Sequence, residues 1–420
     1  MENQENLKRC PVDFDHESET HADNWPDEFR DLRGKCPVAW TEKHGGYWVA
    51  TRYNDIVAMA QDDATFSSFK TFDADSGDVT GGITIPATPI PRGLPVESDR
   101  PDWSMFRSYL NRRFAPKAAE ARRANVRKYA DSLLNRVIET GQIDLVNEFT
   151  GPVPAMTTME LMGLPLDEWR QFADPLHEMV FTPKEAPEYP HVIAGVQWIF
   201  KRCIETFHQR KSEPPRDDLL SYFAHERIDG RPVTEEEMLS FCNNIITGGV
   251  DTTTALTTHA LVYLNQHPED YRRLQDDPKL LPVAREEFVR FFAPIHGLAR
   301  NVSRDVEIDG AKMEKGDRVY LAWSAGNRDP EVFEDPERVD IARFPNRHIA
   351  FGAGMHRCIG SFMARVMFEE MMHVVMARIP DYRSSPDRAR RYTSVGTING
   401  WVDMPTTFTP GPKIETGLVL

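Results

Sequence analysis

Cys358 lies in a segment whose residue types favour a reactive thiolate. The segment reads Phe351-Gly-Ala-Gly-Met-His-Arg-Cys-Ile-Gly360, and an apolar stretch with helical spacing begins at Phe362. A cysteine just before a helix is stabilised as the thiolate, because the helix dipole and unpaired amide N–H groups favour negative charge. The glycines lack a Cβ, so a flat ligand can approach the backbone closely. The segment predicts a thiolate ligand, and the alternative is a buried structural cysteine after a glycine turn.

A second candidate pairs an acid with an alcohol. Asp251 and Thr252 follow the glycines at positions 248 and 249 in the middle of a predicted helix. Two glycines inside a helix destabilise it by about 1 kcal/mol each relative to alanine. A local bulge there would leave space for a small ligand and free a carbonyl group that can bind water. The alternative is that the Asp and Thr side chains only satisfy a helix defect, and the sequence leaves both interpretations open.

Three further groups of charged and polar residues have informative spacing. Glu287 and Arg290 share a helix face and can form an ion pair, although a solvated surface pair is the default interpretation. Trp103 and Arg107 lie one helical turn apart, and both side chains can donate to a carboxylate. Arg300 follows Arg290 by ten residues. Taken singly, such residues are more often ordinary surface or core residues.

Helical periodicity dominates from about residue 103 to about residue 378 and must position most of these groups. The clearest helix begins at Thr234, which forms a capping-box pattern with Glu237, and continues to Leu264. A helix of roughly 33 residues spans roughly 50 Å, so it must be buried centrally.

The first hundred residues are different. They contain a strand-like run at residues 47–51, and residues 73–101 are rich in Gly and Pro and predict a long loop. No internal repeat, low-complexity tract or linker divides the chain. We therefore expect an N-terminal segment at residues 1–39 and a single catalytic domain at residues 40–420.

Composition excludes several classes of protein. The chain has 420 residues with 40% hydrophobic and 27% charged side chains, and its net charge is -15. This charge argues against nucleic acid or an anionic membrane as a partner. No apolar stretch resembles a membrane anchor or a signal peptide. The five cysteines are widely spread and odd in number, so we expect reduced thiols, no disulfide framework and a cytoplasmic location.

The motif FxxGxHxCxG at residues 351–360 resembles the haem loop of the cytochrome P-450 superfamily. GGxDTT at 248–253, ExxR at 287–290 and Asn-Arg-Asp-Pro at 327–330 resemble further motifs of the bacterial members, in the same order. The resemblance begins at about residue 40. It implies a mainly α fold with small β-sheets, in which a long central helix crosses over a buried haem b (iron protoporphyrin IX).

The resemblance also implies roles for the haem-binding residues. Cys358 would be the axial iron ligand, as the thiolate is in this family. The remaining haem contacts would come from Phe351 beside the thiolate, from Gly360 in the same loop, and from residues that meet the propionates: Trp103, Arg107, Arg300 and His356. Many bacterial members carry His where Trp103 stands, and the exchange leaves a hydrogen-bond donor in place.

Other matching positions have roles in catalysis, scaffolding and substrate binding. Asp251 and Thr252 would relay protons during oxygen activation. A structural cluster of Glu287, Arg290 and Arg343 would steady the haem-binding core without taking part in catalysis. A largely apolar set would line the substrate pocket: Ile83, Ile85, Ile245, Gly248, Thr252, Ile295, Leu298, Val395 and Ile398. A terpenoid, steroid, aromatic or acyl-chain substrate fits this set equally well.

The implied function is a haem-thiolate monooxygenase that hydroxylates such a substrate with O2 and two electrons. The electrons would come from a ferredoxin or flavodoxin with its NAD(P)H-dependent reductase. Two alternatives are a haem-binding sensor or carrier without turnover, which has no need of the acid–alcohol pair, and a peroxide-driven enzyme of the same fold, in which that pair is typically lost.

The first prediction concerns Cys358. We expect the reduced protein with carbon monoxide to absorb near the wavelength that gives the family its name, and Cys358→His to abolish that band because the thiolate is lost. Absorption spectra of both proteins test this. A thiolate-type band that persists in the variant contradicts the assignment.

Overall fold

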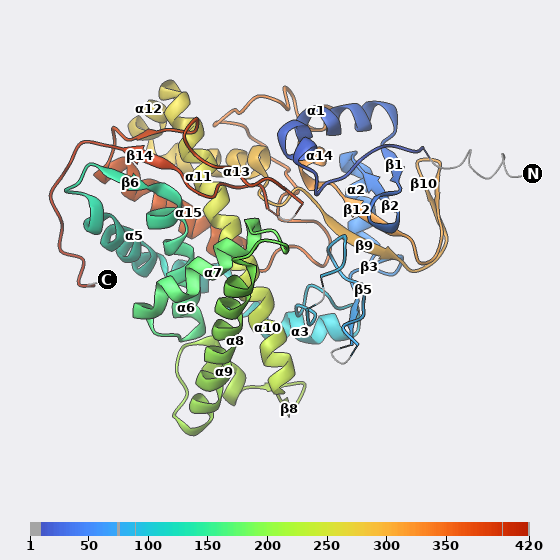
Figure 1. Ribbon diagram of the computed structural model, residues 1–420, viewed down its shortest axis with the longest axis horizontal. Coiled ribbons are helices and arrows are strands. Elements are labelled where there is room, and N and C mark those ends of the chain that lie inside the picture. Colours follow the sequence, from blue (N-terminus) through green and yellow to red (C-terminus); the bar gives the residue numbers. More distant parts are fainter. Residues whose placement is uncertain (1–9, 74–75, 89, 397, 419–420) are drawn as a thin grey trace, which may run out of the picture. The chain divides into compact units, whose positions relative to one another are not determined.

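The computed structural model describes residues 10–73, 76–88, 90–396 and 398–418, and these form two compact units. The first, which we call the β-rich unit, draws on Met1–Ser104, Glu286–Cys358 and Thr393–Asn399 as far as these are described. The second, the helical unit, draws on Met105–Arg285, Ile359–Tyr392 and Gly400–Leu420 as far as these are described. Figure 1 labels the elements of both units.

A five-stranded sheet organises the β-rich unit, with the strand order β1-β2-β12-β9-β3. Only β12 and β2 pair in parallel. The strands are β1 (Val38–Thr41), β2 (Tyr47–Ala50), β3 (Phe66–Ser67), β9 (Leu298–Val302) and β12 (Arg318–Leu321). The strand expected at residues 47–51 is therefore confirmed as β2.

Successive side chains of a strand point to opposite faces of the sheet. Apolar side chains on both faces pack in hydrophobic clusters, so the sheet is buried on both sides. In β2, Trp48 and Ala50 pack in one hydrophobic cluster, and Tyr47 and Val49 pack in the other. Ile85 also belongs to the second cluster. The segment expected as a loop at residues 73–101 thus packs on apolar side chains, as its sequence predicted, but it contains the short strand β5 (Val79–Gly81), which corrects the loop expectation there. Positions 74, 75 and 89 lie outside the described residues.

Short elements complete the β-rich unit. They are α1 (Glu19–Lys35), α2 (Tyr53–Gln61), β4 (Lys70–Phe72), β5 (Val79–Gly81), β10 (Val306–Ile308), β11 (Ala311–Met313) and α14 (Trp323–Gly326). Two helices, α3 (Asp102–Asn111) and α13 (Leu281–Phe292), run from one unit into the other along the chain.

The helical unit contains most of the helices. They are α4 (Pro116–Glu120), α5 (Arg123–Val137), α6 (Pro152–Met162), α7 (Trp169–Phe181), α8 (Tyr189–Ser212), α9 (Leu219–His225), α10 (Glu235–Gly249), α11 (Asp251–Gln266), α12 (Pro268–Asp276) and α15 (Ser361–Arg378). A small sheet has the order β13 (Arg383–Ser384), β14 (Pro405–Thr407), β6 (Gln142–Asp144), and a π-helical turn, η3 (Val146–Thr150), follows β6. The prediction of a mainly α fold with small sheets is confirmed.

The long helix expected from Thr234 to Leu264 is interrupted, which corrects the sequence-based expectation. Its start is right: the Thr234 hydroxyl accepts from the Glu237 amide at 3.1 Å, and the Glu237 carboxylate accepts from the Thr234 amide at 3.0 Å. However, α10 ends at Gly249 and α11 begins at Asp251. Two glycines weaken the helix before this point, and the Thr252 hydroxyl donates a hydrogen bond to the Gly248 carbonyl at 2.9 Å.

A buried ion-pair cluster on α13 holds the chain that leads toward Cys358. The Glu287 and Arg290 side chains are fully buried and form two hydrogen bonds of 2.8 Å. Arg343 donates its Nε–H to Glu287 at 3.0 Å, and the Asn346 side chain donates to the same carboxylate at 3.0 Å. Arg290 also donates to the carbonyl groups of Asn327, Pro336 and Arg338.

These contacts explain the protonation state of Glu287. Burial works against the charged carboxylate, but the hydrogen bonds and positive charges of Arg290 and Arg343 hold the pKa of Glu287 below its ordinary value. The cluster joins α13 to residues 327–346, and its burial excludes the solvated surface pair that is the default interpretation of the spacing. Among the described residues no helix has the length and apolar character needed to span a bilayer.

The second prediction concerns this cluster. Glu287→Gln leaves the buried Arg290 guanidinium without a counter-charge, so we expect the free energy of unfolding to fall by roughly 3–5 kcal/mol at neutral pH. Because the pKa of Glu287 is lower in the folded chain, its contribution is complete above the ordinary value of 4.5 and is lost as the pH falls through the folded value. Urea unfolding at several pH values measures both effects.

The matched control is Glu205→Gln, because Glu205 forms an Arg–Glu pair of the same spacing with Arg202 while 48% of its side chain is exposed. This exposed pair should contribute less than about 1 kcal/mol. Equal losses in the two variants contradict the scaffold role of Glu287.

Candidate functional site

Two left-handed glycines shape the loop that presents Cys358. Gly352 has φ 73° and Gly354 has φ 68°, a backbone region that glycine adopts without penalty. An added Cβ at Gly354 would also overlap the carbonyl oxygen of Ala60 at the end of α2. The Cys358 amide donates to the Phe351 carbonyl at 2.8 Å and closes the loop. Cys358 is exposed, with α15 beginning three residues later.

The β-rich unit brings two of the expected haem-binding residues into contact with each other. The rings of His356 and Trp103 meet edge to face, with centroids 5.9 Å apart. The indole N–H of Trp103 is buried and has no hydrogen-bond acceptor among the described residues. Arg107 lies one turn farther along α3, where its Nε–H donates to the Asn111 side chain at 3.0 Å. Gly360 is the N-cap residue of α15.

Arg300 is an unusual buried cation. Only 2% of it is exposed, and its Nη1 donates to the backbone carbonyl of Ala299 at 2.7 Å. No carboxylate of the described chain lies within 4 Å of its guanidinium. Burial lowers the pKa of Arg300 to about 10, against the opposing charge of Asp99. An anionic ligand would stabilise both this guanidinium and the Trp103 indole, so the donors of the β-rich unit fit a haem propionate in their chemistry.

The acid and the alcohol lie in the helical unit, at the start of α11. Asp251 is 3% exposed and accepts two hydrogen bonds, from His177 Nδ1 at 2.9 Å and from the Tyr392 hydroxyl at 2.7 Å. Thr252 is partly exposed and donates to the Gly248 carbonyl. An added Cβ at Gly248 would meet nothing within 4 Å, so the space beside this carbonyl is open. Adjacent residues thus have different surroundings.

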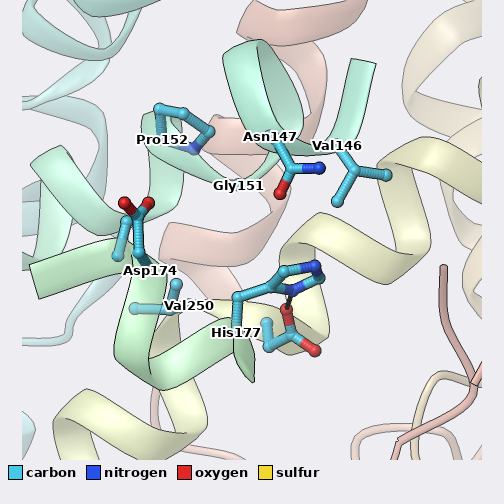
Figure 2. A pocket seen from close by; sticks show the side chains of 9 residues that line it. Val146, Asn147, Gly151, Pro152, Asp174, His177 and Val250 are labelled. Atoms are coloured by element: carbon cyan, nitrogen blue, oxygen red, sulfur yellow. Dashed lines mark hydrogen bonds and ion pairs between the residues drawn. The ribbon is translucent and has the colours of Figure 1, made fainter. Parts of the chain in front are cut away.

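The partners of Asp251 were missed by the sequence analysis. His177 lies on α7, 74 residues before Asp251, and Tyr392 lies 141 residues after it. Neither residue belongs to a local motif, so no sequence signal could have found them. Figure 2 shows the His177 ring among the side chains that line a cleft, with a dashed line marking a hydrogen bond of the ring. The volume of this cleft is about 20 Å³. The cleft is lined by Val146, Asn147, Gly151, Pro152, Ala173, Asp174, His177, Val250 and Asp251.

The residues expected to line the substrate pocket fall in both units. The β-rich unit contains Ile83, Ile85, Ile295, Leu298, Val395 and Ile398, and the helical unit contains Ile245, Gly248 and Thr252. Ile85 is 5% exposed and packs in the core beside the sheet, whereas Ile83, Ile295 and Leu298 are only partly buried. Their role in substrate binding stays a prediction.

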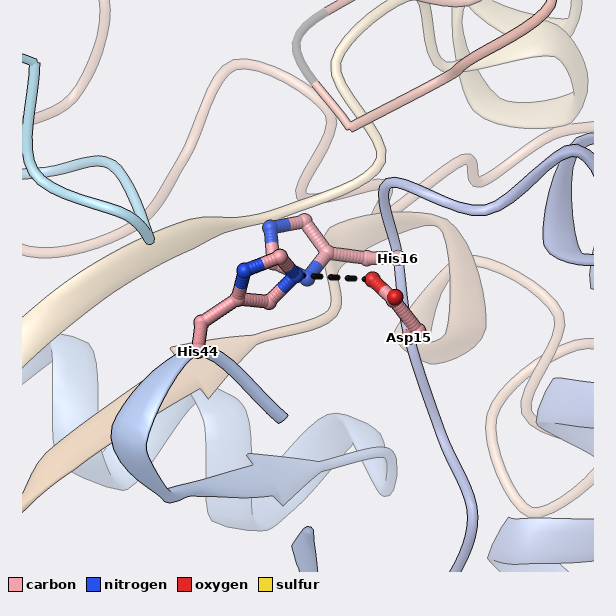
Figure 3. Close-up of side chains that lie close together, drawn as sticks. All are labelled: Asp15, His16 and His44. Atoms are coloured by element: carbon pink, nitrogen blue, oxygen red, sulfur yellow. Dashed lines mark hydrogen bonds and ion pairs between the residues drawn. The ribbon is translucent and has the colours of Figure 1, made fainter. Parts of the chain in front are cut away.

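A cluster of Asp15, His16 and His44 also has ligand atoms within 4.8 Å of one another (Figure 3). His16 has a structural role, because its ring nitrogens form hydrogen bonds with the Tyr47 hydroxyl and the Ile85 carbonyl, each at 2.7 Å. His44 bonds to Asp15 at 2.8 Å. Burial lowers the pKa of His16 to about 4, so its ring is neutral. These bonds account for the cluster as structural.

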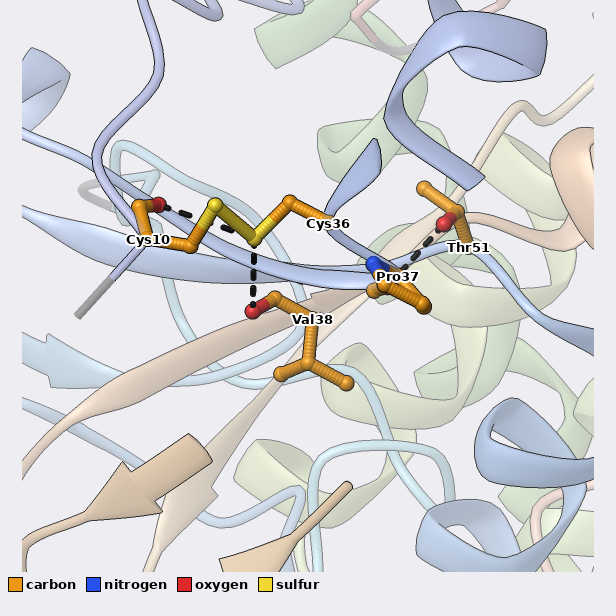
Figure 4. The surroundings of a disulfide bond; sticks show 5 residues. All are labelled: Cys10, Cys36, Pro37, Val38 and Thr51. Carbon is orange, nitrogen blue, oxygen red and sulfur yellow. Dashed lines mark hydrogen bonds between the residues drawn. A yellow bond between two sulfur atoms is a disulfide. The ribbon is translucent and has the colours of Figure 1, made fainter. Parts of the chain in front are cut away.

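The cysteines correct one expectation. Cys10 and Cys36 form a disulfide, with their Cα atoms 6.4 Å apart (Figure 4). Backbone pairing explains the contact: the Trp40 amide donates to the Cys10 carbonyl at 2.9 Å, which aligns residue 10 with the chain just after Cys36. Cys203 and Cys242 are buried, and burial raises the pKa of the Cys242 thiol. Among the three free cysteines, Cys358 is the exposed one.

The chain is similar in sequence to a known protein family and to several of its members. The family model Cytochrome P-450 matches residues 155–379. Linalool 8-monooxygenase of Pseudomonas putida is 29% identical over 397 residues, which cover 91% of this chain and 95% of the relative. Steroid C26-monooxygenase of Mycobacterium tuberculosis is 26% identical over 390 residues, covering 92% and 94%.

A solved structure agrees with these relatives. The crystal structure of a Bacillus megaterium protein of this family in complex with testosterone has a TM-score of 0.80 and 25% identity to this chain. The match covers 93% of this chain and 100% of that structure. The family model, the relatives and the fold thus agree with the cysteine loop, and the chain belongs to the cytochrome P-450 family of haem-thiolate monooxygenases.

Proposed function

We propose that the protein hydroxylates a small-to-medium apolar organic molecule, with O2 and two electrons from a separate redox protein. The glycine loop that presents an exposed Cys358 carries this proposal, because a thiolate at this position gives haem its oxygen-activating chemistry in the family. The related proteins named for linalool and steroid oxidation, and the structure with testosterone, support a terpenoid or steroid as the substrate class. Aromatic and acyl-chain molecules are the alternatives.

Cys358 and a set of hydrogen-bond donors would hold the haem. In this proposal the Cys358 thiolate would bind the haem iron, and Phe351 and Gly360 would shape the loop around it. The propionates would accept hydrogen bonds from Trp103 and His356 and from the guanidinium groups of Arg107 and Arg300. Support comes from the buried Trp103 indole and the buried Arg300, because each is stabilised by an anionic acceptor. When bound, haem supplies the activation of dioxygen, and the chain supplies position and protons.

Asp251 and Thr252 would deliver those protons. The Thr252 hydroxyl gives its hydrogen to the Gly248 carbonyl, so its oxygen can accept a hydrogen bond from a neighbouring water molecule. Asp251 can hold a proton at the buried carboxylate that begins the same helix. The presence of this pair favours O2-dependent turnover over the two alternatives, a sensor or carrier and a peroxide-driven enzyme.

A ferredoxin or flavodoxin with its NAD(P)H-dependent reductase would supply the electrons, as redox partners do for bacterial members of the family. The expected cytoplasmic location stays a prediction. A reducing compartment would keep Cys10 and Cys36 as thiols, so the disulfide is the observation that bears against it.

The third prediction concerns substrate class. We expect linalool or testosterone, used as terpenoid and steroid probes, to displace iron-bound water and shift the Soret band, whereas a charged sugar should not because the predicted lining is apolar. Titration by absorption, followed by product analysis with a surrogate ferredoxin system and NADH, tests the proposal. If no terpenoid, steroid, aromatic or acyl-chain probe gives both a shift and a product, the proposed function is wrong.

The fourth prediction concerns Thr252. Thr252→Ala should still bind substrate and consume NADH, but product per NADH should fall by about tenfold or more, with hydrogen peroxide in its place, because proton delivery is impaired. The control is Thr257→Ala, which removes the same kind of hydroxyl-to-carbonyl bond, at 2.9 Å, later in α11. Unchanged product yield in Thr252→Ala would show that Thr252 is only a helix residue.

A further inference from the structure

Asp251 is clamped by two donors from distant parts of the helical unit. His177 Nδ1 contacts one carboxylate oxygen at 2.9 Å, and the Tyr392 hydroxyl contacts the other at 2.7 Å. The side chain of His177 is 12% exposed and that of Asp251 is 4% exposed. The Tyr392 amide bonds to the Gly400 carbonyl at 3.2 Å, which fixes the tyrosine from its backbone. The carboxylate is thus held at both oxygens in a largely buried place.

The hydrogen bonds of His177 require a proton between it and Asp251. Its Nε2 lies 3.1 Å from the carbonyl of Val402, which can only accept, so Nε2 carries a hydrogen. Its Nδ1 lies against the Asp251 carboxylate. A neutral imidazole has a single N–H, so the second contact holds another proton, at His177 Nδ1 or at the carboxyl of Asp251. The Tyr392 hydroxyl donates to the other oxygen.

Two of the groups near His177 carry a charge that favours this extra proton, namely Asp251 from α11 and Asp144 from β6. Tyr392 and Asp174, which lies one turn earlier on α7, are also near the ring. Burial opposes a charged imidazole, but the hydrogen bond and charge of Asp251 outweigh it, and the pKa of His177 is raised above its ordinary value. Burial and the charge of Asp251 raise the pKa of Tyr392, so this hydroxyl stays protonated.

The same imidazole reaches a cleft. His177, Asp174 and Asp251 all line it, together with the turn of η3 and the start of α6 (Figure 2). A volume of about 20 Å³ holds about one water molecule, and Asn147 and Asp174 contribute polar side chains to its lining. Burial raises the pKa of Asp174, against the opposing charges of Arg170 and His177. The cleft thus places a space for about one water molecule beside the His177–Asp251 pair.

We propose that His177 is a positioning residue for Asp251, which holds the carboxylate jointly with Tyr392 and keeps one transferable proton on the pair. This inference rests on the proposed role of Asp251 and Thr252 in proton delivery. When Asp251 gives up its proton, the N–H bond at His177 Nδ1 breaks and an O–H bond forms at the Asp251 carboxylate. A proton from bulk solvent then restores the N–H bond at His177 Nδ1, so the pair ends as it began.

The pH dependence follows from the shared proton. Below the pKa of the pair the proton is present and delivery is intact, and above it the pair is empty. Product per NADH should therefore decline as the pH rises through the pKa of His177. A purely structural histidine would not give this profile, because its hydrogen bonds to neutral groups do not depend on the shared proton.

The fifth prediction is tested first by NMR, independently of turnover. Imidazole resonances of the ferrous carbon monoxide form are titrated in the wild type and in Asp251→Asn, with His177→Gln used to assign the signal. We expect His177 to titrate above the ordinary histidine range in the wild type and at a lower pH in Asp251→Asn, where only the Val402 carbonyl and the charge of Asp144 still oppose burial. Titration at or below the ordinary range in the wild type, or no change in Asp251→Asn, overturns the proposal.

Turnover variants test the consequence. His177→Gln keeps an N–H donor toward Asp251 without a titrating ring, so product per NADH should lose its decline at high pH. His177→Phe removes both donors and should lower product per NADH by about tenfold. The control is His208→Gln, a histidine that pairs with Glu235 at 2.6 Å while 54% of its side chain is exposed. This control should retain the wild-type profile.

Each variant is first checked for the carbon monoxide band, and if His177→Phe fails that check, His177→Gln and Tyr392→Phe decide the test. A wild-type pH profile in His177→Gln overturns the proposal. Full coupling in Thr252→Ala is a different failure: it removes the proposed proton-delivery role, while the NMR titration still shows by itself whether His177 and Asp251 share a proton.

Discussion

The fully buried Glu287–Arg290 pair is the constraint on which the β-rich unit depends. Two charges removed from water are tolerated only where every donor and acceptor is used, and here the carboxylate accepts from Arg290, Arg343 and Asn346. The guanidinium in turn donates hydrogen bonds to three backbone carbonyl groups between residues 327 and 338. Because both partners bind several separate stretches of chain, the pair fixes α13 against the segment that continues into the cysteine loop. The loop itself then needs only two left-handed glycines and one hydrogen bond from Cys358 to Phe351 to hold its shape.

In the helical unit, the corresponding feature is an interruption between α10 and α11. The sequence of α10 and α11 would form one continuous helix if Gly248 and Gly249 were better helix formers. Instead, the helix is interrupted at Val250. The interruption leaves the Gly248 carbonyl to the Thr252 hydroxyl and puts Asp251 in the first turn of a new helix. A carboxylate in the first turn is favoured by the helix dipole. A locally unfavourable stretch thus places two proton-bearing groups next to each other.

Features encoded in short windows could be predicted from the sequence, and those made by contacts between distant segments could not. The capping box at Thr234, strand β2 and the ion pair of α13 each depend on residues within four positions of one another. The cysteine loop was found for the same reason. By contrast, the disulfide depends on pairing of residue 10 with Trp40, and the clamp on Asp251 on residues 74 and 141 positions away. Spacing and composition contain no record of such register, so an odd number of cysteines suggested reduced thiols.

The arrangement at residues 251 and 252 also limits how a proton can move. Successive side chains on a helix point about 100° apart, so Asp251 faces His177 and Tyr392 while Thr252 turns back to Gly248. Both oxygens of the Asp251 carboxylate are occupied by donors, and the Thr252 hydrogen is committed to a carbonyl. A direct hydrogen bond between the two side chains would require at least one of these contacts to break. If the pair acts as proposed, a proton therefore passes either through a water molecule in the open space beside Gly248 or by release of Asp251 from one of its two donors. His177 is the donor that can lose a proton, because the hydroxyl of Tyr392 is held in its neutral form.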